Sequence, residues 1–419
     1  MHNIEDKMDT NIAETISSSA RWLIKQQHKD SGGWPDRSGG HINILNTAEA
    51  IIALIDSQEC SAGHDSIILG REYIKSHQII KDDQAYFPRE VVKDDGNTVL
   101  VPDMVRTCFA VQALLAAGIS ANDSVISKAV KWLIKNQDKE SCGWSYFVGK
   151  SVEILPTCFA LLTLINVYKN SNELDTNVIT RSIDHLINSH FNVEGNCSRG
   201  SFGVDANLLA SNTLYCILTL QSSRLCNVGS YSTQEDAAIA WLLRNPDRAL
   251  RQMEAWVDID GGGYGYTIMA DTLLIRALMG SNKEANLKTI LFKEAMKSLK
   301  DKVDDISGAF YGYRAFSWST AKAISALSML RTPGGWSETE FPSRSPEYEG
   351  KKTGPTIIWF AVGLAALGTG LMAFEKFNII GFIFYIALFL GVMTAHNKLS
   401  EKTFKEVLLA AINTVKKEK

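Results

Sequence analysis

Three carboxylates lie near one apolar segment and could take part in acid–base chemistry. Asp258 and Asp260 precede a glycine-rich turn, and Asp271 stands at the start of the apolar stretch that follows it. A carboxyl group donates a proton only where burial raises its pKa enough to keep it protonated, whereas a carboxylate that caps a helix stays ionised. The sequence leaves both interpretations of Asp271 open, catalytic proton donor and helix cap.

Other polar residues recur close to the beginnings of similar apolar segments. The candidate ligand-binding set comprises Asn46, Asp103, Arg106, Asn212, Asp258, Asp260, Arg276, Arg314 and Ser319. If these segments are helices that form a closed ring, we expect the polar residues to gather at one mouth of that ring. Such a mouth could bind a small or peptidic ligand. The alternative is that Arg and Asp side chains there pair with each other and bind no ligand.

Metal and cofactor chemistry are not expected. The sequence contains neither a His-Glu-x-x-His segment nor a phosphate-binding P-loop. Its seven cysteines are scattered and include no Cys-x-x-Cys pair, which is typical of a reducing compartment rather than of a disulfide framework or a zinc site. Cys108 and Cys158 occupy the same repeat position, which predicts packing, and Cys142 takes the place that Gly32 has in an earlier turn.

The elements that must position these groups are six apolar stretches with one pattern. Each begins with Thr or Asp and has Leu seven residues later. They start at Thr47, Thr107, Thr157, Thr213, Asp271 and Thr320, at intervals of 49 to 60 residues. Thr and Asp are good N-caps, so we predict that a helix begins at each of them. A helix that is apolar on all sides must be buried on all sides.

Amphipathic helices are predicted between the buried ones. They fall at residues 11–28, 65–78, around Trp132, 181–189, 236–244 and 291–302. Turns rich in glycine and aromatic residues join each to the next buried helix, and no alternating strand pattern competes with this prediction. The fold class is therefore predicted as all-α. Six helix pairs most simply close into a double ring, although the periodicity alone also allows an open solenoid.

Two of the units carry a motif that resembles a known family. Gln27…Gly33-Trp34 and Gln137…Gly143-Trp144 are similar to the QW repeats of squalene cyclases and of the related protein prenyltransferase β-subunits. The resemblance covers about residues 11–336, and it is strong in two units and diffuse in the other four. It implies an (α/α)6 toroid in which the buried helices form the inner ring around a central cavity.

The catalytic motifs of the two families are only partly present. Squalene-type cyclases carry Asp-x-Asp-Asp-Thr at the start of an inner helix, where a protonated Asp donates to an alkene. The matching place here reads Ile268-Met-Ala-Asp-Thr272, so the resemblance implies this role for Asp271 alone. Prenyltransferase β-subunits hold zinc with an Asp-x-Cys pair and a later His, and this chain has no Asp-x-Cys. The sequence therefore predicts no metal site.

The C-terminal part differs in composition from the repeats. Residues 331–355 form a linker rich in Pro, Gly, Ser and Glu, and uncharged apolar runs follow at 356–374 and 379–394. A helix of about 20 apolar residues crosses a bilayer, so we predict two transmembrane helices within residues 356–397. Lysines flank the pair on both sides, which places the toroid and the C-terminus on the cytoplasmic side of the inner membrane.

Charge distribution indicates which partners to expect. Residues 398–419 place apolar side chains on one helical face and lysines elsewhere, which is typical of a basic amphipathic tail on an anionic leaflet. The whole chain carries a net charge of −3, and its basic excess lies at this end, so residues 1–330 are acidic. Nucleic acid is excluded as the main partner because phosphate binding needs a basic surface. The expected partners are the lipid bilayer, an unknown small-molecule or protein ligand, and further copies of the chain associated through the hairpin.

Three functions fit the sequence. The first is a non-catalytic toroid that senses a ligand or partner and acts through the hairpin; this layout resembles bacterial membrane effectors, antiviral ones included, that permeabilise membranes. The second is a membrane-bound terpene-cyclase-like enzyme with Asp271 as proton donor. The third is a scaffold that binds another protein at the toroid rim. A preserved scaffold with incomplete catalytic motifs favours the first, so we do not expect an enzyme.

Overall fold

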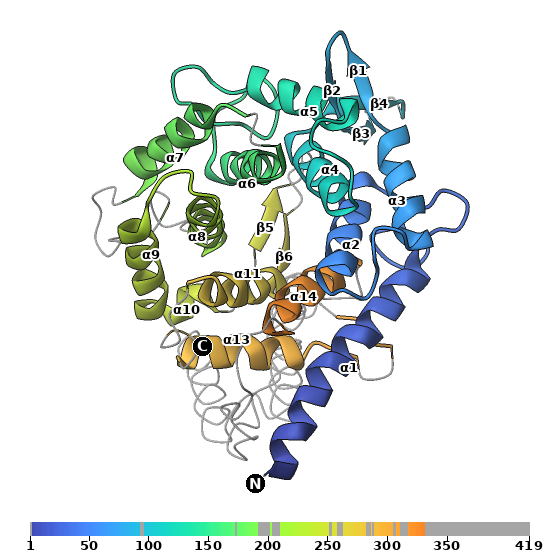
Figure 1. Ribbon diagram of the computed structural model, residues 1–419, viewed down its shortest axis with the longest axis vertical. Coiled ribbons are helices and arrows are strands. Elements are labelled where there is room, and N and C mark those ends of the chain that lie inside the picture. The colour runs from blue at the N-terminus through green and yellow to red at the C-terminus, as the bar shows by residue number, and fades with distance from the viewer. Residues whose placement is uncertain are drawn as a thin grey trace, which may run out of the picture. The chain divides into compact units, whose positions relative to one another are not determined.

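The computed structural model describes most of the first 331 residues. The described ranges are 2–92, 96–171, 174–191, 202, 210–250, 254–257, 263–281, 286, 289–304, 307–310 and 317–331. Within them the chain is mainly helical, and the helices form two concentric rings (Figure 1). The described part has the (α/α)6 toroid fold that the sequence predicted.

The inner ring contains the predicted buried helices. They are α2 (Ile44–Asp56), α4 (Met104–Ala116), α6 (Ile154–Ser171), α8 (Ala210–Leu225), α11 (Thr267–Met279) and α14 (Ser317–Ser328). Each packs against the next in chain order, and α14 packs against α2, so the ring is closed rather than an open solenoid.

The outer ring contains the amphipathic helices. They are α1 (His2–Gln26), α3 (Asp65–Ser76), α5 (Ser124–Lys135), α7 (Thr176–His190), α9 (Ser232–Arg244) and α13 (Ile290–Lys300). From α3 onward, each outer helix packs on the inner helix that precedes it in the chain. Helix α1 has no predecessor and packs on α14, so the two ends of the repeat array meet. A short helix, α10 (Pro246–Ala249), follows α9, and a 3-10 turn, η1 (Met329–Arg331), follows α14.

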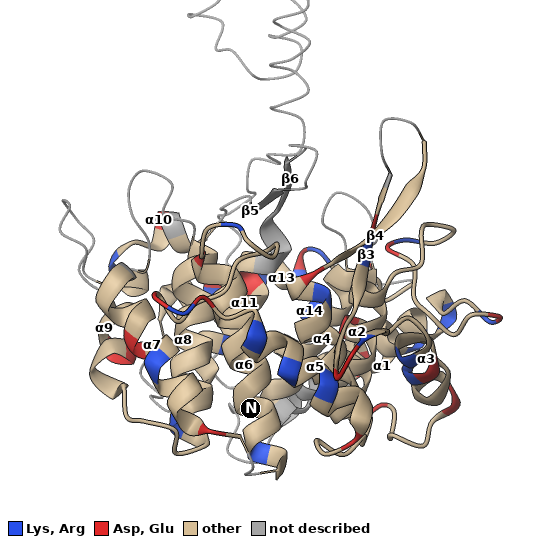
Figure 2. Ribbon diagram, turned by 90° about the horizontal axis from the view of Figure 1, so that it is seen from above, with Lys and Arg blue, Asp and Glu red and all other residues tan. Residues whose placement is uncertain are grey.

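Three short antiparallel hairpins correct the all-α prediction. They pair β1 (Ile79–Lys81) with β2 (Gln84–Tyr86), β3 (Pro88–Val92) with β4 (Thr98–Pro102), and β5 (Glu254–Val257) with β6 (Gly263–Tyr266). Strands of three to five residues are too short for an alternating pattern to stand out in the sequence. The hairpin β3–β4 leads into α4 and rises from one face of the ring (Figure 2), and β5–β6 leads into α11.

The inner helices begin earlier than predicted, so the repeated threonines are not their caps. Asn43 caps α2 and Asp103 caps α4, each accepting a backbone N–H from the first turn of its helix. Thr47 and Thr107 are therefore the fourth residues of their helices. The cap prediction was wrong because Thr fits the helix start and its first turn equally well by side-chain chemistry.

Each repeated threonine instead joins its inner helix to the preceding turn. Its hydroxyl accepts the backbone N–H of a buried aromatic residue at 2.9 or 3.0 Å. The five pairs are Thr47 with Trp34, Thr107 with Phe87, Thr157 with Trp144, Thr213 with Phe202, and Thr320 with Phe310. All ten residues are at most 1% exposed, so each bond satisfies a backbone donor that has no access to water.

The QW motif joins neighbouring outer helices. The Gln27 side chain donates to the Gly32 carbonyl and to the Ser66 carbonyl of α3, at 2.7 and 2.8 Å. Gln137 makes the same link from the end of α5 to Ser182 of α7, at 2.7 Å. The Trp34 indole N–H donates back to its own outer helix, at the Leu23 carbonyl.

The second unit makes this glutamine link without a tryptophan. Gln78 donates to the Val125 carbonyl of α5 at 2.7 Å, and the buried aromatic residue of the unit is Phe87. The unit was harder to recognise because the hairpin β1–β2 lies between its glutamine and its aromatic residue.

Contacts between the first and last units close the ring. The Ser19 hydroxyl of α1 donates to the Gly308 carbonyl at 2.7 Å, and the Ser317 N–H donates to the Asp36 carbonyl at 2.9 Å. Gly308 has φ +76°, and a Cβ on it would lie 2.6 Å from the Ser18 carbonyl carbon. The close approach of α1 therefore requires glycine at this position.

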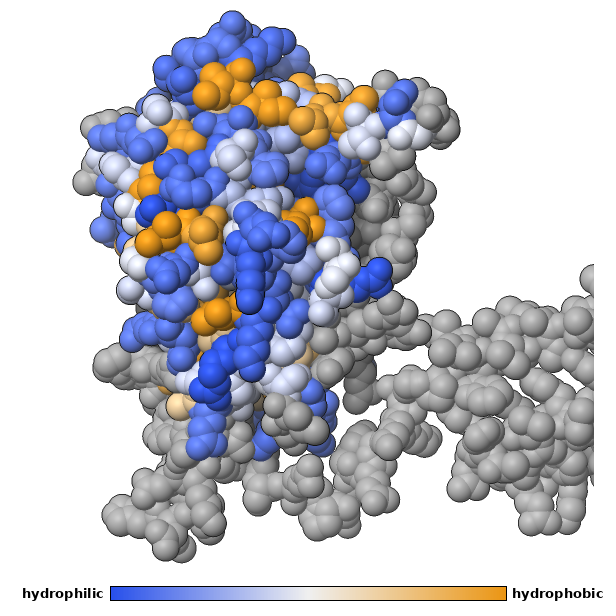
Figure 3. Space-filling view, turned by 90° about the vertical axis from the view of Figure 1, so that its right-hand side faces the viewer, coloured by the Kyte–Doolittle hydropathy of each residue, from blue (hydrophilic) through white to orange (hydrophobic). Residues whose placement is uncertain are grey.

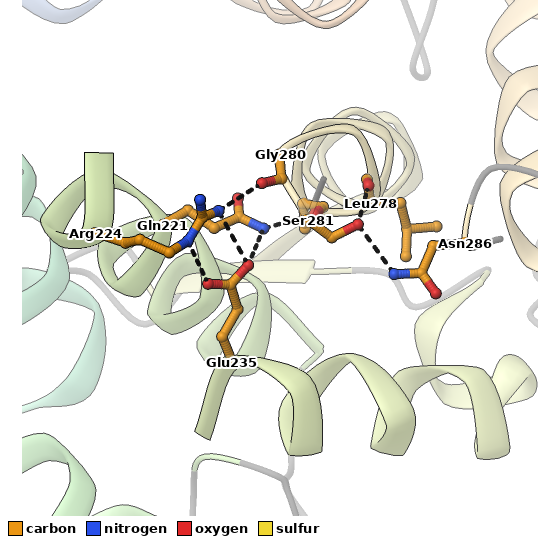
Figure 4. Close-up of polar contacts among 8 residues, drawn as sticks. Gln221, Arg224, Glu235, Leu278, Gly280, Ser281 and Asn286 are labelled. Carbon is orange, nitrogen blue, oxygen red and sulfur yellow. Dashed lines mark hydrogen bonds and ion pairs between the residues drawn. The ribbon is translucent and has the colours of Figure 1, made fainter. Parts of the chain in front are cut away.

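A polar cluster fixes α8, α9 and the end of α11 to one another (Figure 4). Glu235 accepts from Arg224 at 3.1 Å and from Gln221 at 3.3 Å. Arg224 also donates to the Gly280 carbonyl at 2.9 Å, and Gln221 donates to the Ala277 carbonyl at 2.8 Å. The last carbonyls of α11 thus receive donors from the neighbouring helices, which satisfies groups that a helix end leaves unpaired.

The outer face seen in Figure 3 is mostly hydrophilic, with small apolar groups between polar ones. Exposed apolar side chains such as Leu69, Ile80 and Leu100 are distributed over α3, β1 and β4. No helix in the described ranges is both long and apolar enough to cross a bilayer. The predicted hairpin at 356–397, the tail at 398–419 and nearly all of the linker at 331–355 lie outside those ranges.

Replacing a repeated threonine should destabilise the toroid. Thr157→Val should lower the free energy of unfolding by about 1–3 kcal/mol, because the Trp144 N–H would be buried without an acceptor. Thr157→Ser keeps the hydroxyl and should cost less, and Thr180→Val on α7 should have little effect because Thr180 bonds only within its own helix. Urea unfolding measures all three; equal loss in Thr157→Val and Thr157→Ser would contradict this role.

Candidate functional site

Several predicted site residues lie at the same end of the inner ring. Asn46, Arg106, Asn212 and Ser319 are each the third residue of an inner helix, and Asp103 caps one of these helices. The inner helices run parallel, because an outer helix returns the chain between one and the next. The structure therefore places these five residues at the mouth where the inner helices begin.

The side chains at this mouth bond mainly to the protein itself. Asp103 Oδ1 accepts the Arg106 N–H at 2.8 Å, and Arg106 Nη1 donates to the Pro88 carbonyl at 3.2 Å. Burial raises the pKa of Asp103, against the lowering effect of the Arg106 N–H and guanidinium. Ser319 donates to the Phe310 carbonyl at 2.8 Å. These contacts agree with the alternative in which polar residues here hold the structure together.

Asp271 faces the outer ring. Its carboxylate accepts from Ser298 Oγ at 2.7 Å and forms an ion pair with the Lys302 ammonium group. Ser298 belongs to α13 and Lys302 lies two residues beyond the end of that helix. The Asp271 side chain is almost completely buried. Asp271 replaces the repeated threonine in the fifth unit, and it joins its inner helix to an outer helix instead of to an aromatic turn.

Of the remaining predicted residues, one lies elsewhere in the ring and three fall outside the described ranges. Arg276 lies in the last turn of α11, away from the helix starts. Asp258, Asp260 and Arg314 lie outside the described residues, the first two between β5 and β6 in the sequence. Among the residues that the structure describes, no group of three His, Cys, Asp or Glu side chains could hold a metal ion.

The repeated cysteines lie in the core as predicted. Cys108 and Cys158 are both 0% exposed, and burial raises the pKa of Cys108 to about 12. A thiol with so high a pKa is a poor nucleophile at neutral pH. Cys142 has φ +55°, which is the left-handed conformation expected where it replaces a turn glycine.

One residue from each inner helix reaches the ring axis at a common level. These residues, two positions after the repeated Thr or Asp, form an axial layer: Glu49, Phe109, Phe159, Tyr215, Leu273 and Lys322. All six are at most 8% exposed, so protein fills the ring interior at this level. The sequence analysis did not select them, although their constant offset from the repeat was available as a signal.

A chain of contacts runs through the axial layer. Glu49 Oε1 and Lys322 Nζ are 2.9 Å apart, and Lys322 Nζ lies 5.1 Å from the centroid of the Phe109 ring. Phe109 meets Phe159 edge-on at 5.5 Å between centroids, and Phe159 meets Tyr215 edge-on at 4.8 Å. Three aromatic rings and one buried ion pair therefore occupy the axis.

Both members of the ion pair have raised pKa values. Burial raises the pKa of Glu49, against the attraction of Lys322 and its hydrogen bond. Burial acts to lower the pKa of Lys322, but attraction by Glu49 and Tyr215 together with the hydrogen bond to Glu49 raises it overall. The ammonium group also lies over an aromatic face, where a cation is attracted by the ring quadrupole. The protein thus supplies its own cation to the aromatic rings at the axis.

The comparisons with known proteins concern the fold. No protein-family model and no curated protein matches the sequence. Among solved structures, the chain is similar to a variant of the type II terpene cyclase MstE from Scytonema in complex with geranylgeranyl dihydroxybenzoate; the identity is 15%, the match covers 76% of this chain and 97% of that chain, and the TM-score is 0.51.

Two mannanases show a similar likeness. One is an inactive variant of the α-1,6-mannanase GH76A of Salegentibacter sp. HEL1_6, with 11% identity, coverage of 76% and 98%, and a TM-score of 0.53. The other is the GH76 α-mannanase BT2949 of Bacteroides thetaiotaomicron, with 14% identity, coverage of 75% and 94%, and a TM-score of 0.53. Proteins of different chemistry share this toroid, so the likeness confirms the fold and leaves the function to the site.

The axial ion pair gives a testable stability effect. Glu49→Leu or Lys322→Met alone should lower the free energy of unfolding by about 3–5 kcal/mol, because each leaves a buried charge without its partner. The double variant should recover much of that loss, since it removes both charges. Urea unfolding of the four proteins forms a double-mutant cycle; strictly additive losses would show that the two side chains are not coupled.

Proposed function

We propose that this protein is a non-catalytic, ligand-binding toroid that acts on the inner membrane through its C-terminal hairpin. The observation that carries the non-catalytic part is the pairing of Asp271 with Lys302. Lys302 and Ser298 both donate to this carboxylate, so it is held in the packing between α11 and the outer ring. The Asp271 side chain is also directed to the outer helix, away from the axis where a substrate would lie.

The occupied axis also supports binding without catalysis. Aromatic rings in a cyclisation site would face a substrate cation, whereas the Phe109 ring here is approached by Lys322. Because Glu49 and Lys322 are buried at the axis, a ligand would bind at one of the two ends of the inner ring. A small ligand that binds the toroid can then shift the equilibrium between resting and active states of the attached segment.

The membrane part of the proposal comes from the sequence. The uncharged runs at 356–374 and 379–394 have the length and composition of membrane spans, and Gly363, Gly368 and Gly370 would let neighbouring helices pack closely. We propose that copies of the hairpin associate and permeabilise the cytoplasmic membrane, as an antiviral-type effector would. The toroid and the C-terminus would then be cytoplasmic.

Two other functions remain as alternatives. A terpene-cyclase-like activity would be consistent with the fold shared with MstE, whose structure was solved with geranylgeranyl dihydroxybenzoate. It would need a proton donor other than an Asp271 paired with lysine. A scaffold that binds another protein at the toroid rim would need neither catalysis nor membrane permeability, and the following experiments separate it from the effector.

Expression of the full chain should depolarise the bacterial inner membrane. Leu364→Arg should abolish this effect, because an arginine near the middle of a span costs about 2.5–3.5 kcal/mol on insertion. Leu364→Ile is the matched control and should behave as the parent chain. A potential-sensitive dye in growing cells, with protein levels checked by immunoblot, provides the measurement. Equal potentials in all three strains, with and without phage infection, would overturn the effector proposal.

Asp271→Asn should lower the stability of the toroid without removing its effect on the membrane potential. The substitution leaves Lys302 without its partner and should lower the melting temperature, but the membrane effect should persist wherever the protein is folded. Lys302→Met is the companion variant and should do the same. If Asp271→Asn kept the parent melting temperature and removed an isoprenoid product from cell extracts, the cyclase alternative would replace this proposal.

A further inference from the structure

The residues of the inner ring become partly exposed to solvent one helical turn beyond the axial layer. Three residues further along each inner helix lie Ile52, Gln112, Leu162, Leu218, Arg276 and Ser325. Residues three apart on a helix share a face, so this second layer also faces the axis, about 4.5 Å further along it. All of these side chains except Leu218 are partly exposed, whereas every residue of the axial layer is buried. Solvent therefore reaches the second layer from the end where the inner helices terminate.

Two opposite charges lie at this level on nearby helices. Arg276 belongs to α11 and Asp56 to the last turn of α2, with Ser325 of α14 between them in the ring. The Ser325 hydroxyl donates to Asp56 Oδ2 at 3.2 Å. Arg276 attracts Asp56 electrostatically, yet among the described residues no ion pair or hydrogen bond joins these two side chains.

Asp56 is exposed at the end of α2, so a ligand can reach its carboxylate. Desolvation by the surrounding protein raises the pKa of Asp56, against the attraction of Arg276 and the hydrogen bond from Ser325. Contact with water limits the energetic effect of this shift, so the carboxylate is available to pair with a cationic group.

From this arrangement we infer that the protein binds a small zwitterion with an apolar side chain, such as a hydrophobic α-amino acid, between Asp56 and Arg276. The ligand carboxylate pairs with the Arg276 guanidinium group, which suits the planar geometry of a carboxylate. The ligand ammonium group pairs with Asp56 and Ser325. The inference rests on the proposed sensing role and names the class of ligand for it.

Charge and polarity in the second layer favour this class over a simple anion. Asp56 would repel an anion, and the one basic residue of the layer, Arg276, is balanced by it. The axial pair of Glu49 and Lys322 next to it is itself neutral. A ligand with two opposite charges and no net charge matches these groups, and Ile52 and Leu162 offer apolar contact for its side chain.

Binding is tested on the full chain in detergent. A thermal-shift screen of the twenty standard amino acids identifies any that raise the melting temperature, and calorimetry then measures the dissociation constant of each. We expect at least one aliphatic amino acid, for example leucine, to bind. Its analogues with one charge, 3-methylbutylamine and 4-methylpentanoate for leucine, should bind at least ten-fold more weakly.

Two variants and a matched control locate the site. Asp56→Asn and Arg276→Gln should each weaken binding at least ten-fold, whereas Arg181→Gln on the exposed side of α7 should leave it unchanged. Without ligand, Asp56→Asn should melt close to the parent temperature, because an amide oxygen at this exposed position can still accept from Ser325, so its loss of binding would not reflect unfolding.

Three results would overturn the inference. They are no binding by any of the twenty amino acids, parent-like binding by both variants, and equal binding of an amino acid and its carboxylate-only analogue. The third result would indicate a simple anion site at Arg276. Because membrane potential is measured separately, binding without depolarisation would refute the effector proposal alone, and depolarisation without binding would refute this inference alone.

Discussion

The fold depends on one hydrogen bond that is repeated around the ring. In five units a threonine hydroxyl of the inner helix accepts the backbone N–H of a buried aromatic residue in the turn before it. A backbone N–H buried in apolar surroundings must find an acceptor, and the aromatic ring next to it brings a large apolar area into the core. This bond sets the position of each turn against its inner helix. The glutamines after α1, α3 and α5 then set each outer helix against the next.

The common register has a consequence at the centre. Because the same helical position bears the threonine in five units, the residues two positions later arrive at the axis at one level. There they form a layer of three aromatic rings, one leucine and the Glu49–Lys322 ion pair. The pair joins α2 to α14, which are the first and last inner helices. The ion pair at the axis therefore helps to close the ring. Together with the aromatic rings, it fills the axis between the two mouths of the toroid.

The fifth unit departs from the repeat, and this departure changes the functional interpretation. Asp271 stands where a threonine would bond to an aromatic turn, and it bonds to Lys302 and Ser298 instead. The carboxylate that most resembles a cyclase acid thus belongs to the packing of α11 against α13. At the opposite end of the ring, Arg276 attracts Asp56 without a direct bond, and Asp56 accepts from Ser325. A binding role at that end is compatible with a toroid that carries no catalysis.

The sequence by itself determined the repeated helix pairs, their burial and the toroid, because a helix apolar on all sides and a QW motif are local patterns. It also predicted the core positions of Cys108 and Cys158 and the turn in which Cys142 takes the place of a glycine. It could not locate the helix starts, since Thr47 and Asn43 are both suitable caps, or the hairpins, whose strands are very short. Only the tertiary structure decided the site. Three contacts depend on how the ring closes. They are the pairing of Asp271 with Lys302, the pairing of Glu49 with Lys322 across 273 residues of chain, and the proximity of Arg276 to Asp56. Ring closure sets distances between residues far apart in the chain, and no local pattern encodes those distances.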